Sequence, residues 1–118
     1  MNEQKTAQAL LIIDMQNDFV HPGTPVHVAG AAATVPVIRK LRESCRKHEI
    51  PVFHVIRSYS ADGLTVERAR LADFRRTPFV VPGTHGAEII AELKPEAGET
   101  VVIKPRYSAF FQTNLDLM

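Results

Sequence analysis

Two charged side chains each follow an apolar run and could act together as an acid–base pair. Asp14 comes directly after Ala9–Ile13, and Lys104 comes directly after Val101–Ile103. Apolar runs without alternation are typical of parallel strands, and ligands of such sheets lie beyond the carboxyl ends of the strands. We therefore expect an ion pair at one edge of one sheet, in which the carboxylate stays ionised and can move a proton. The alternative is that both charged residues are simply the solvated first residues of loops and have no role in catalysis.

Three further side chains are candidates for substrate binding. Arg57 follows the apolar run Val52–Ile56, where its guanidinium could hold a substrate carboxylate through two parallel hydrogen bonds or form a surface salt bridge. Phe19 and Tyr107 lie just beyond the predicted ion pair and could form apolar walls of a small pocket. Phe19 could equally pack within a loop.

Two other reactive side chains are interpreted as structural. Asp18 is expected to cap a turn, because a second buried anion next to Asp14 would be costly. Cys45, the one cysteine, continues a helical stripe with Ile38 and Leu41. A thiol among apolar neighbours behaves as a small hydrophobe, so we expect Cys45 in the core.

The elements that must position these residues alternate between strand and helix. The apolar runs Ala9–Ile13, Val52–Ile56 and Val101–Ile103 predict three strands. The proline-rich stretch His21–Pro25 predicts a loop after the first strand. Strands joined by helical crossovers predict a doubly wound α/β sheet, a three-layer α/β/α Rossmann-like arrangement with only its first three strands present.

Four helices are expected between and after the strands. Thr34 is predicted to cap the first, with Pro36 in its first turn and the Ile38, Leu41 and Cys45 stripe facing the sheet. A short helix is predicted over Val66–Phe74. The spacings of two further sets of side chains predict one helix each: Ala87, Ile90 and Leu93; and Phe111, Leu115 and Met118 with Ser108 as cap.

The first strand is expected to have one bare edge. The first strand of such a sheet usually lies in the middle, yet three strands cover only one of its sides. An exposed apolar edge at Leu10–Ile13 would favour dimerisation, swapping or aggregation, unless a loop or neighbouring chain covers it. A homo-oligomer is therefore expected.

Composition excludes several classes of function. The chain has 118 residues, 45% hydrophobic and 23% charged, which fits one globular domain. A net charge of +1 without a basic stripe argues against nucleic acid or anionic membrane as partner. Without a long apolar run or a secretory stretch, a cytoplasmic location is expected. Met15–Asp18 is not the glycine-rich turn that a nucleotide-binding module requires after its first strand.

Three separated blocks, in order, resemble the isochorismatase-like cysteine hydrolase family. They are Leu11–Phe19, Pro82–Ile89 and Val102–Phe110, and together they run nearly end to end. The resemblance implies that residues 1–118 are the N-terminal part of a single hydrolase domain. It also implies hydrolysis of a small molecule through an Asp, Lys and Cys triad, the bond being an amide, a carbamoyl group or a vinyl ether.

Asp14 and Lys104 match two members of that triad, and the resemblance places the cysteine after a fourth strand, beyond Met118. The chain alone is therefore expected to be inactive. The alternative is a non-catalytic association or regulatory chain of the same fold that has lost its nucleophile.

No metal or other cofactor is expected. In the nicotinamidase branch of the family an Asp and His cluster after the second strand holds a divalent metal, and His54–Gly63 lacks that cluster. His54 lies within an apolar strand and is expected to be a hydrogen-bonded core residue. The remaining histidines lack the spacing of a metal site: His21, His27, His48 and His85.

Overall fold

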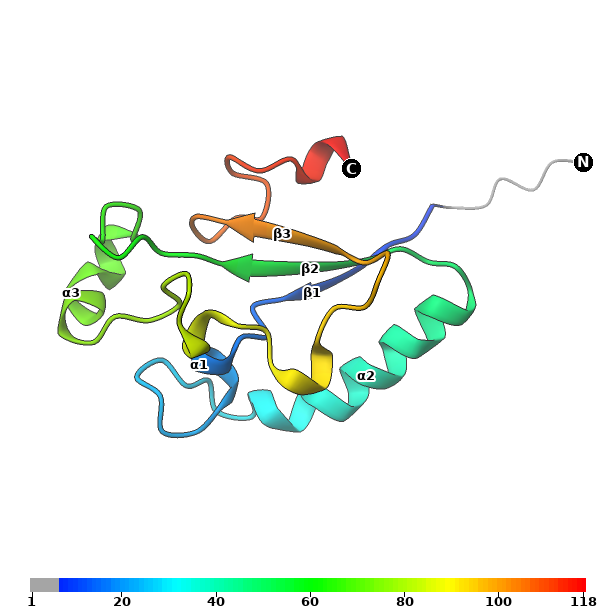
Figure 1. Cartoon of the computed structure of the whole chain (residues 1–118), viewed down its shortest axis with the longest axis horizontal. Coiled ribbons are helices and arrows are strands. Elements are labelled where there is room, and N and C mark those ends of the chain that lie inside the picture. Colours follow the sequence, from blue (N-terminus) through cyan, green and yellow to red (C-terminus); the bar gives the residue numbers. More distant parts are fainter. Residues whose placement is uncertain (1–6) are drawn as a thin grey trace, which may run out of the picture.

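The structure, a computed structural model, describes residues 7–118 and contains a three-stranded sheet (Figure 1). The strands are β1 (Leu10–Ile13), β2 (Val52–Arg57) and β3 (Thr100–Lys104). The α-helices are α1 (Asn17–Val20), α2 (Ala31–Lys47) and α3 (Arg68–Arg76), and the 3-10 turns are η1 (His85–Ala87), η2 (Ala91–Leu93) and η3 (Leu115–Leu117). No helix among these residues is long and apolar enough to cross a membrane.

The sheet has the order β1-β2-β3, and both neighbouring pairs are parallel. Leu10 is paired with Val52 at the start of the first pair, and Arg57 with Lys104 at the end of the second. Parallel pairing agrees with the apolar runs that predicted these strands, and the predicted α/β fold class is confirmed. All three strands end at the same edge, so the polar residues that follow them face a common space.

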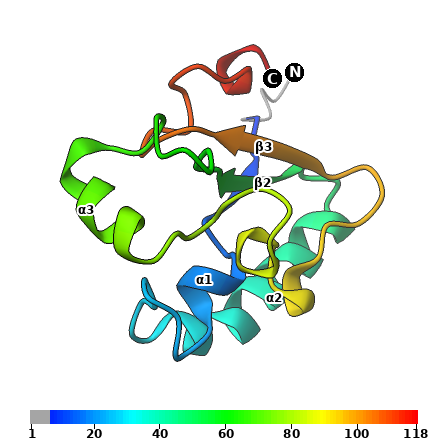
Figure 2. The same ribbon diagram turned by 60° about the vertical axis from the view of Figure 1, so that its left-hand side comes forward.

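Helix α2 covers one face of the sheet (Figures 1 and 2). Its buried residues Val35 and Cys45, with the partly buried Ile38, pack against Ile12 and Val52. The predicted stripe was wrong at Leu41, which is 50% exposed, whereas the neighbouring Arg42 is buried. This packing is the main source of the helix's stability, because helices in proteins are stabilised mostly by burial of their apolar face.

Helix α2 also begins earlier than predicted. Its first residue is Ala31, because Gly30 takes a left-handed conformation with φ 84° that turns the chain into the helix. Thr34 is therefore not the cap: its Oγ1 donates to the carbonyl oxygen of Ala31 at 2.6 Å within the first turn. Pro36 lies inside the helix instead of in its first turn.

Among residues 7–118, the opposite face of the sheet is covered by the C-terminal segment. Leu115 packs on Val55 and Val102, while Leu11 and Ile13 of β1 stay 36% and 48% exposed. Among the described residues β1 pairs with β2 alone, so the exposed edge predicted for the first strand is present there.

The predicted final helix was wrong, because only η3 forms there. Of its three apolar residues only Leu115 is buried, and Phe111 and Met118 stay exposed. A short amphipathic helix without a surface to pack on is unstable. Ser108 does not begin a helix but accepts a local hydrogen bond from the amide of Phe110 at 3.1 Å.

The connection from β2 to β3 also differs from prediction. Helix α3 begins at Arg68 and ends at Arg76, two residues later at each end than expected. The helix predicted from Ala87, Ile90 and Leu93 is replaced by η1 and η2. Two backbone hydrogen bonds to the segment after β1 divert the chain: the amide of Asn17 donates to Glu88, and the amide of Ile90 donates to Met15.

Candidate active site

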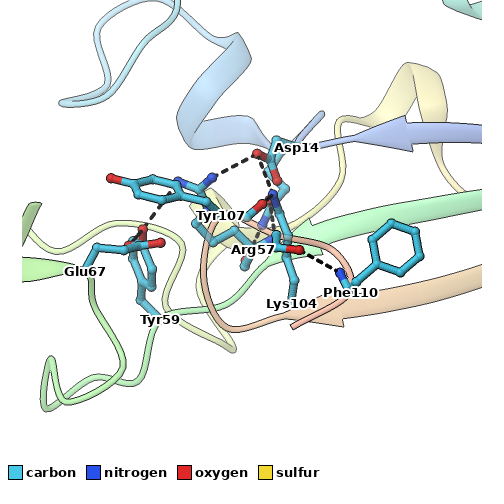
Figure 3. Close-up of polar contacts among 9 residues, drawn as sticks. Asp14, Arg57, Tyr59, Glu67, Lys104, Tyr107 and Phe110 are labelled. Atoms are coloured by element: carbon cyan, nitrogen blue, oxygen red, sulfur yellow. Dashed lines mark hydrogen bonds and ion pairs between the residues drawn. The ribbon is translucent and has the colours of Figure 1, made fainter. Parts of the chain in front are cut away.

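Asp14, Arg57 and Lys104 meet at the carboxyl edge of the sheet (Figure 3). Each follows or ends a different strand, so the parallel register brings them to one place. Lys104 Nζ and Arg57 Nη2 both lie 3.3 Å from Asp14 Oδ2. The predicted ion pair therefore forms, although β3 lies two strand positions, about 10 Å, from β1. Its catalytic role stays a prediction.

Asp14 has an uncommon backbone conformation, and only one of its two carboxylate oxygens contacts the neighbouring cations. Its φ of 59° lies in the left-handed region, which Asp tolerates better than most residues. Its amide donates to the carbonyl oxygen of Val55 at 2.8 Å, which fixes it at the end of β1. Both cations use Oδ2, and Oδ1 has no hydrogen-bond partner among residues 7–118. One carboxylate oxygen is therefore left to accept a proton.

Lys104 is almost fully buried, with a side chain 3% exposed. Its ammonium also donates to the carbonyl oxygen of Tyr107 at 2.7 Å, in the turn that follows β3. A buried ammonium group is tolerated only when anionic or carbonyl oxygens surround it, as here. The turn after β3 therefore aims the ammonium at Asp14.

Arg57 lies between the ion pair and a group of aromatic rings. Its side chain is 8% exposed, and Nη1 donates to the hydroxyl of Tyr59 at 3.3 Å. The guanidinium carbon lies 5.6 Å from the ring centre of Phe19 and 5.0 Å from that of Tyr107. The three residues predicted to bind substrate are therefore brought together, within the range of cation–π attraction. Phe19 is buried, and Tyr107 is 53% exposed.

A cavity of about 320 Å³ adjoins Asp14. Phe19 and Arg57 line it together with apolar side chains such as Ile13 and Met15. A larger cavity of about 790 Å³ is lined by Ile56, Arg57 and Ile103 but not by Asp14. The smaller cavity is the one in which the predicted chemistry could occur.

Two buried residues beside Arg57 were missed by the sequence analysis. Tyr59 is fully buried, and its hydroxyl donates to the carboxylate of Glu67. Burial raises the pKa of Tyr59, and the hydrogen bond to Glu67 raises it further, so the phenol stays protonated. The available signal was the two-residue step from Arg57 to Tyr59, which continues the strand alternation past the end of β2.

Gln16 is a further missed residue and braces the site. It is fully buried; its Nε2 donates to the carbonyl oxygens of Arg57 at 2.8 Å and Ala87 at 2.9 Å. Its Oε1 accepts from the amide of Arg57 at 2.8 Å. The segment after β1 is thereby tied to the end of β2. No local periodicity marks a glutamine for such a role.

Cys45 lies where the sequence analysis placed it, whereas Asp18 does not cap a local turn. Asp18 does not contact Asp14: its carboxylate accepts from the amide of Val80 at 2.7 Å. Cys45 is buried in the apolar cluster beneath the sheet, next to Ile12. The prediction of a core cysteine is confirmed.

His54 is a buried, hydrogen-bonded core residue, as predicted. It is 1% exposed, and its Nε2 lies 2.8 Å from Glu99 Oε1. Burial alone would raise the pKa of Glu99, yet hydrogen bonds from Arg46 and His54 outweigh it and lower that pKa to about 2. In residues 7–118, no three His, Cys, Asp or Glu side chains are grouped as metal ligands would be.

Residues 8–118 match the protein family described as isochorismatase domain. A protein described as a probable inactive nicotinamidase from Arabidopsis thaliana is 37% identical over 98% of this chain and 60% of its own length. The isochorismatase of Bacillus subtilis is 41% identical over 90% of this chain and 33% of its own length. The chain therefore spans at most about three fifths of these relatives.

Solved structures show the same fold. An isochorismatase family protein from Desulfovibrio vulgaris superimposes with a TM-score of 0.90 and 48% identity, covering 96% of this chain and 60% of that one. The N-carbamoylsarcosine amidase from Thermoplasma acidophilum gives 0.78 and 33%, covering 95% and 60%. The arrangement of strands described above is therefore shared with longer proteins.

Proposed function

Because the chain belongs to the isochorismatase domain family, we propose that it carries the acid–base half of a cysteine hydrolase that cleaves a small-molecule amide or carbamoyl C–N bond. The observation that supports this most is the contact of Lys104 Nζ with Asp14 Oδ2, at 3.3 Å, beside an unpartnered Oδ1. Proteins similar to this chain include ureidoacrylate amidohydrolases and an N-carbamoylsarcosine amidase. Their names describe cleavage of this kind of bond.

In the proposed reaction, Asp14 accepts the thiol proton of a cysteine, and Lys104 stabilises the thiolate electrostatically. The thiolate attacks the carbonyl carbon, and the C–N bond breaks as Asp14 returns the proton to the leaving nitrogen. Water then attacks the thioester, giving one proton to Asp14. The acid leaves and the thiolate is reprotonated, so every proton taken is returned.

The cysteine of this triad is proposed to lie outside these 118 residues. Cys45 is the one cysteine in the sequence, and it is buried in an apolar cluster beneath the sheet. The relatives extend well beyond the matched region, which leaves room for a nucleophile there. We accordingly propose that residues 1–118 are the N-terminal part of one hydrolase domain and are inactive alone.

The substrate is proposed to lie in the cavity beside Asp14. Phe19 lines this cavity and would form one apolar wall, and Tyr107, whose ring centre lies 5.0 Å from the Arg57 guanidinium carbon, would form a second. Arg57 lines the same cavity. We further propose that the protein is a cytoplasmic homo-oligomer and that its reaction needs no metal or cofactor.

An assay of amine or ammonia release tests the proposal. The protein that carries this chain would be given carbamoyl, ureido and nicotinamide-type amides, and Asp14→Asn should lower kcat/KM by about 10²- to 10⁴-fold. Asp116→Asn, at an exposed aspartate near the C-terminal residue, is the matched control and should leave kcat/KM unchanged. Full activity in Asp14→Asn would refute the acid–base role.

A second candidate function is association without catalysis. It is favoured by the similarity to a protein described as probably inactive and by the exposed apolar side chains of β1. The intact mass of the native protein separates the two: a mass near 13.1 kDa supports the association chain, and a markedly larger mass supports the hydrolase.

A further inference from the structure

A chain of buried contacts leads from a carboxylate outside the sheet to Asp14 (Figure 3). Glu67 accepts from the hydroxyl of Tyr59, and that hydroxyl accepts from Arg57 Nη1 at 3.3 Å. Arg57 Nη2 donates to Asp14 Oδ2 at 3.3 Å. The four residues therefore form one continuous path, and the triad chemistry proposed above uses only its last member.

Glu67 sets the direction in which the Tyr59 hydroxyl points. A phenol has one hydrogen to donate, and here it goes to the carboxylate. The oxygen then has only lone pairs left, so it can only accept on the side where Arg57 lies. Without Glu67 the hydrogen would be free to rotate toward Arg57, where two donors would face each other.

Tyr59 cannot move away from this position. Its ring is fully buried and packs edge-on against Phe74, with ring centres 5.8 Å apart, and against Phe79, at 5.5 Å. Edge-to-face contacts of this kind stabilise one orientation of the ring. Helix α3 and the loop after it thus hold the hydroxyl in place from outside the sheet.

Arg57 is in turn fixed both at its backbone and at its guanidinium. Its backbone amide and carbonyl are bound by the side chain of Gln16, at 2.8 Å each. Its terminal nitrogens are used by Tyr59 and Asp14, and its remaining Nε is buried without a partner among the residues described. Two of the five N–H donors of the guanidinium are thus held by the hydroxyl of Tyr59 and the carboxylate of Asp14, which fixes its orientation toward Asp14.

The consequence falls on the two oxygens of Asp14. Arg57 and Lys104 approach the same atom, Oδ2, from two different strands. The carboxylate is therefore held in one rotation, with Oδ1 presented without a partner. If Arg57 were released, the carboxylate could rotate about its last bond, and the proton-accepting oxygen would lose its fixed position.

We propose that Tyr59 and Glu67 form a buried clamp on Arg57, and that Arg57 is a positioning residue that orients Asp14 for proton transfer rather than the group that binds a substrate carboxylate. This inference rests on the proposed hydrolase function. It assigns a function to two residues that sequence patterns did not single out.

Kinetics of Tyr59→Phe test the clamp, because phenylalanine keeps the packed ring and removes only the hydroxyl. In the protein that carries this chain, kcat should fall about 10- to 100-fold while KM stays the same. The loss should be equal for a substrate pair that differs only in a carboxylate, and the acid limb of the pH–rate profile should move to higher pH. Glu67→Gln should act in the same direction, and the double variant should be no worse than Tyr59→Phe.

A carboxylate-binding Arg57 gives a different pattern. In that case Arg57→Lys would raise KM for the acidic member of the pair alone, and Tyr59→Phe would leave the pH profile in place. Either result overturns the clamp. Glu92→Gln, at an exposed glutamate of η2, is the matched control and should leave both parameters unchanged.

A spectroscopic readout makes the test independent of activity. The side-chain ¹³C carboxyl resonance of Asp14 in this chain should shift in Tyr59→Phe and not in Ser60→Ala, the neighbouring control. An unmoved resonance overturns the clamp even if no substrate is found. If Asp14→Asn keeps full activity, the proposed function fails whatever the resonance shows. If Asp14→Asn loses activity but Tyr59→Phe changes neither the kinetics nor the resonance, the clamp alone fails.

Discussion

The carboxylates of two buried ion clusters on the same sheet differ in how completely their oxygens are hydrogen-bonded. On the face toward α2, Glu99 accepts from His54, from Arg46 and from the amide of Glu96, so both carboxylate oxygens are used. At the carboxyl edge, Asp14 has both cations on Oδ2 and none on Oδ1. The first arrangement is what stability requires, and the second retains capacity for a proton.

The difference separates a structural use of buried charge from a chemical one. A carboxylate with both oxygens hydrogen-bonded holds the elements it joins, here the segment before β3 against α2 and β2. An incompletely satisfied carboxylate stabilises the fold less, and functional sites commonly accept that loss. Substitutions around Asp14 should therefore lower activity, whereas substitutions around Glu99 should lower the free energy of unfolding.

The largest expected effect is on activity, in Lys104→Met. We expect kcat/KM of the protein that carries this chain to fall by about 10²- to 10⁴-fold, because the ammonium beside Asp14 is lost. The free energy of unfolding should change by about 1 kcal/mol or less, since Asp14 keeps Arg57 and is partly exposed. Amide hydrolysis and urea unfolding measure the two, with Lys40→Met on the exposed side of α2 as control. If Lys104→Met lost much stability and kept full activity, the assignment of a chemical use to the charges around Asp14 would be wrong.

The opposite result is expected at Glu99. Glu99→Ala should lower the free energy of unfolding by about 2–3 kcal/mol, because it removes charge-assisted hydrogen bonds and leaves His54 buried without a partner. The activity of the folded fraction should stay within twofold of wild type, or about 0.4 kcal/mol. Urea unfolding with parallel kinetics checks both parts. A stable but inactive variant would contradict the structural assignment.

Acid should weaken the same cluster. The pKa of Glu99 is lowered from 4.5 to about 2, so its contribution to stability is present above about pH 4.5 and is lost as the pH falls toward 2. The wild-type free energy of unfolding should therefore decrease by about 2–3 kcal/mol more than that of Glu99→Gln across this window. Urea titrations between pH 5 and pH 2.5 measure the difference. Parallel curves for the two proteins would exclude this origin.

The smallest effect on stability is expected at Glu96, at the exposed edge of the cluster around Glu99. Glu96 lies 2.8 Å from Arg46 but its side chain is 60% exposed, so solvent screens the pair. Glu96→Gln should cost less than about 0.5 kcal/mol. The same urea measurement applies, and raising the salt concentration should remove what difference there is. A cost as large as that of Glu99→Ala would mean that burial does not separate the two carboxylates.

The strands and the meeting of Asp14 with Lys104 could be predicted because both depend on local pattern. Continuous apolar runs identify parallel strands, and the parallel register then brings the residues that follow them to one edge. The fold class follows from the same runs. Cys45 was placed correctly by its position on a helical stripe.

The rest depended on contacts between distant segments, which no periodicity encodes. The helix expected at Ala87–Leu93 fails because its backbone pairs with the segment after β1. The hydrogen bond between Tyr59 and Glu67 was missed because the strand alternation that reaches Tyr59 does not extend to its partner in the following loop. The start of α2 depended on the left-handed backbone at Gly30, which begins the helix before the predicted cap Thr34.

The backbone of Asp14 also bears on how an enzyme of this kind could become a silent relative. At φ 59° the position favours Asp, Asn or Gly and resists β-branched or bulky residues. Asn and Gly are each a single base change from an aspartate codon. Mutation can therefore remove the carboxylate without straining the backbone at this turn, and the ammonium of Lys104 then keeps its hydrogen bond to the carbonyl oxygen of Tyr107.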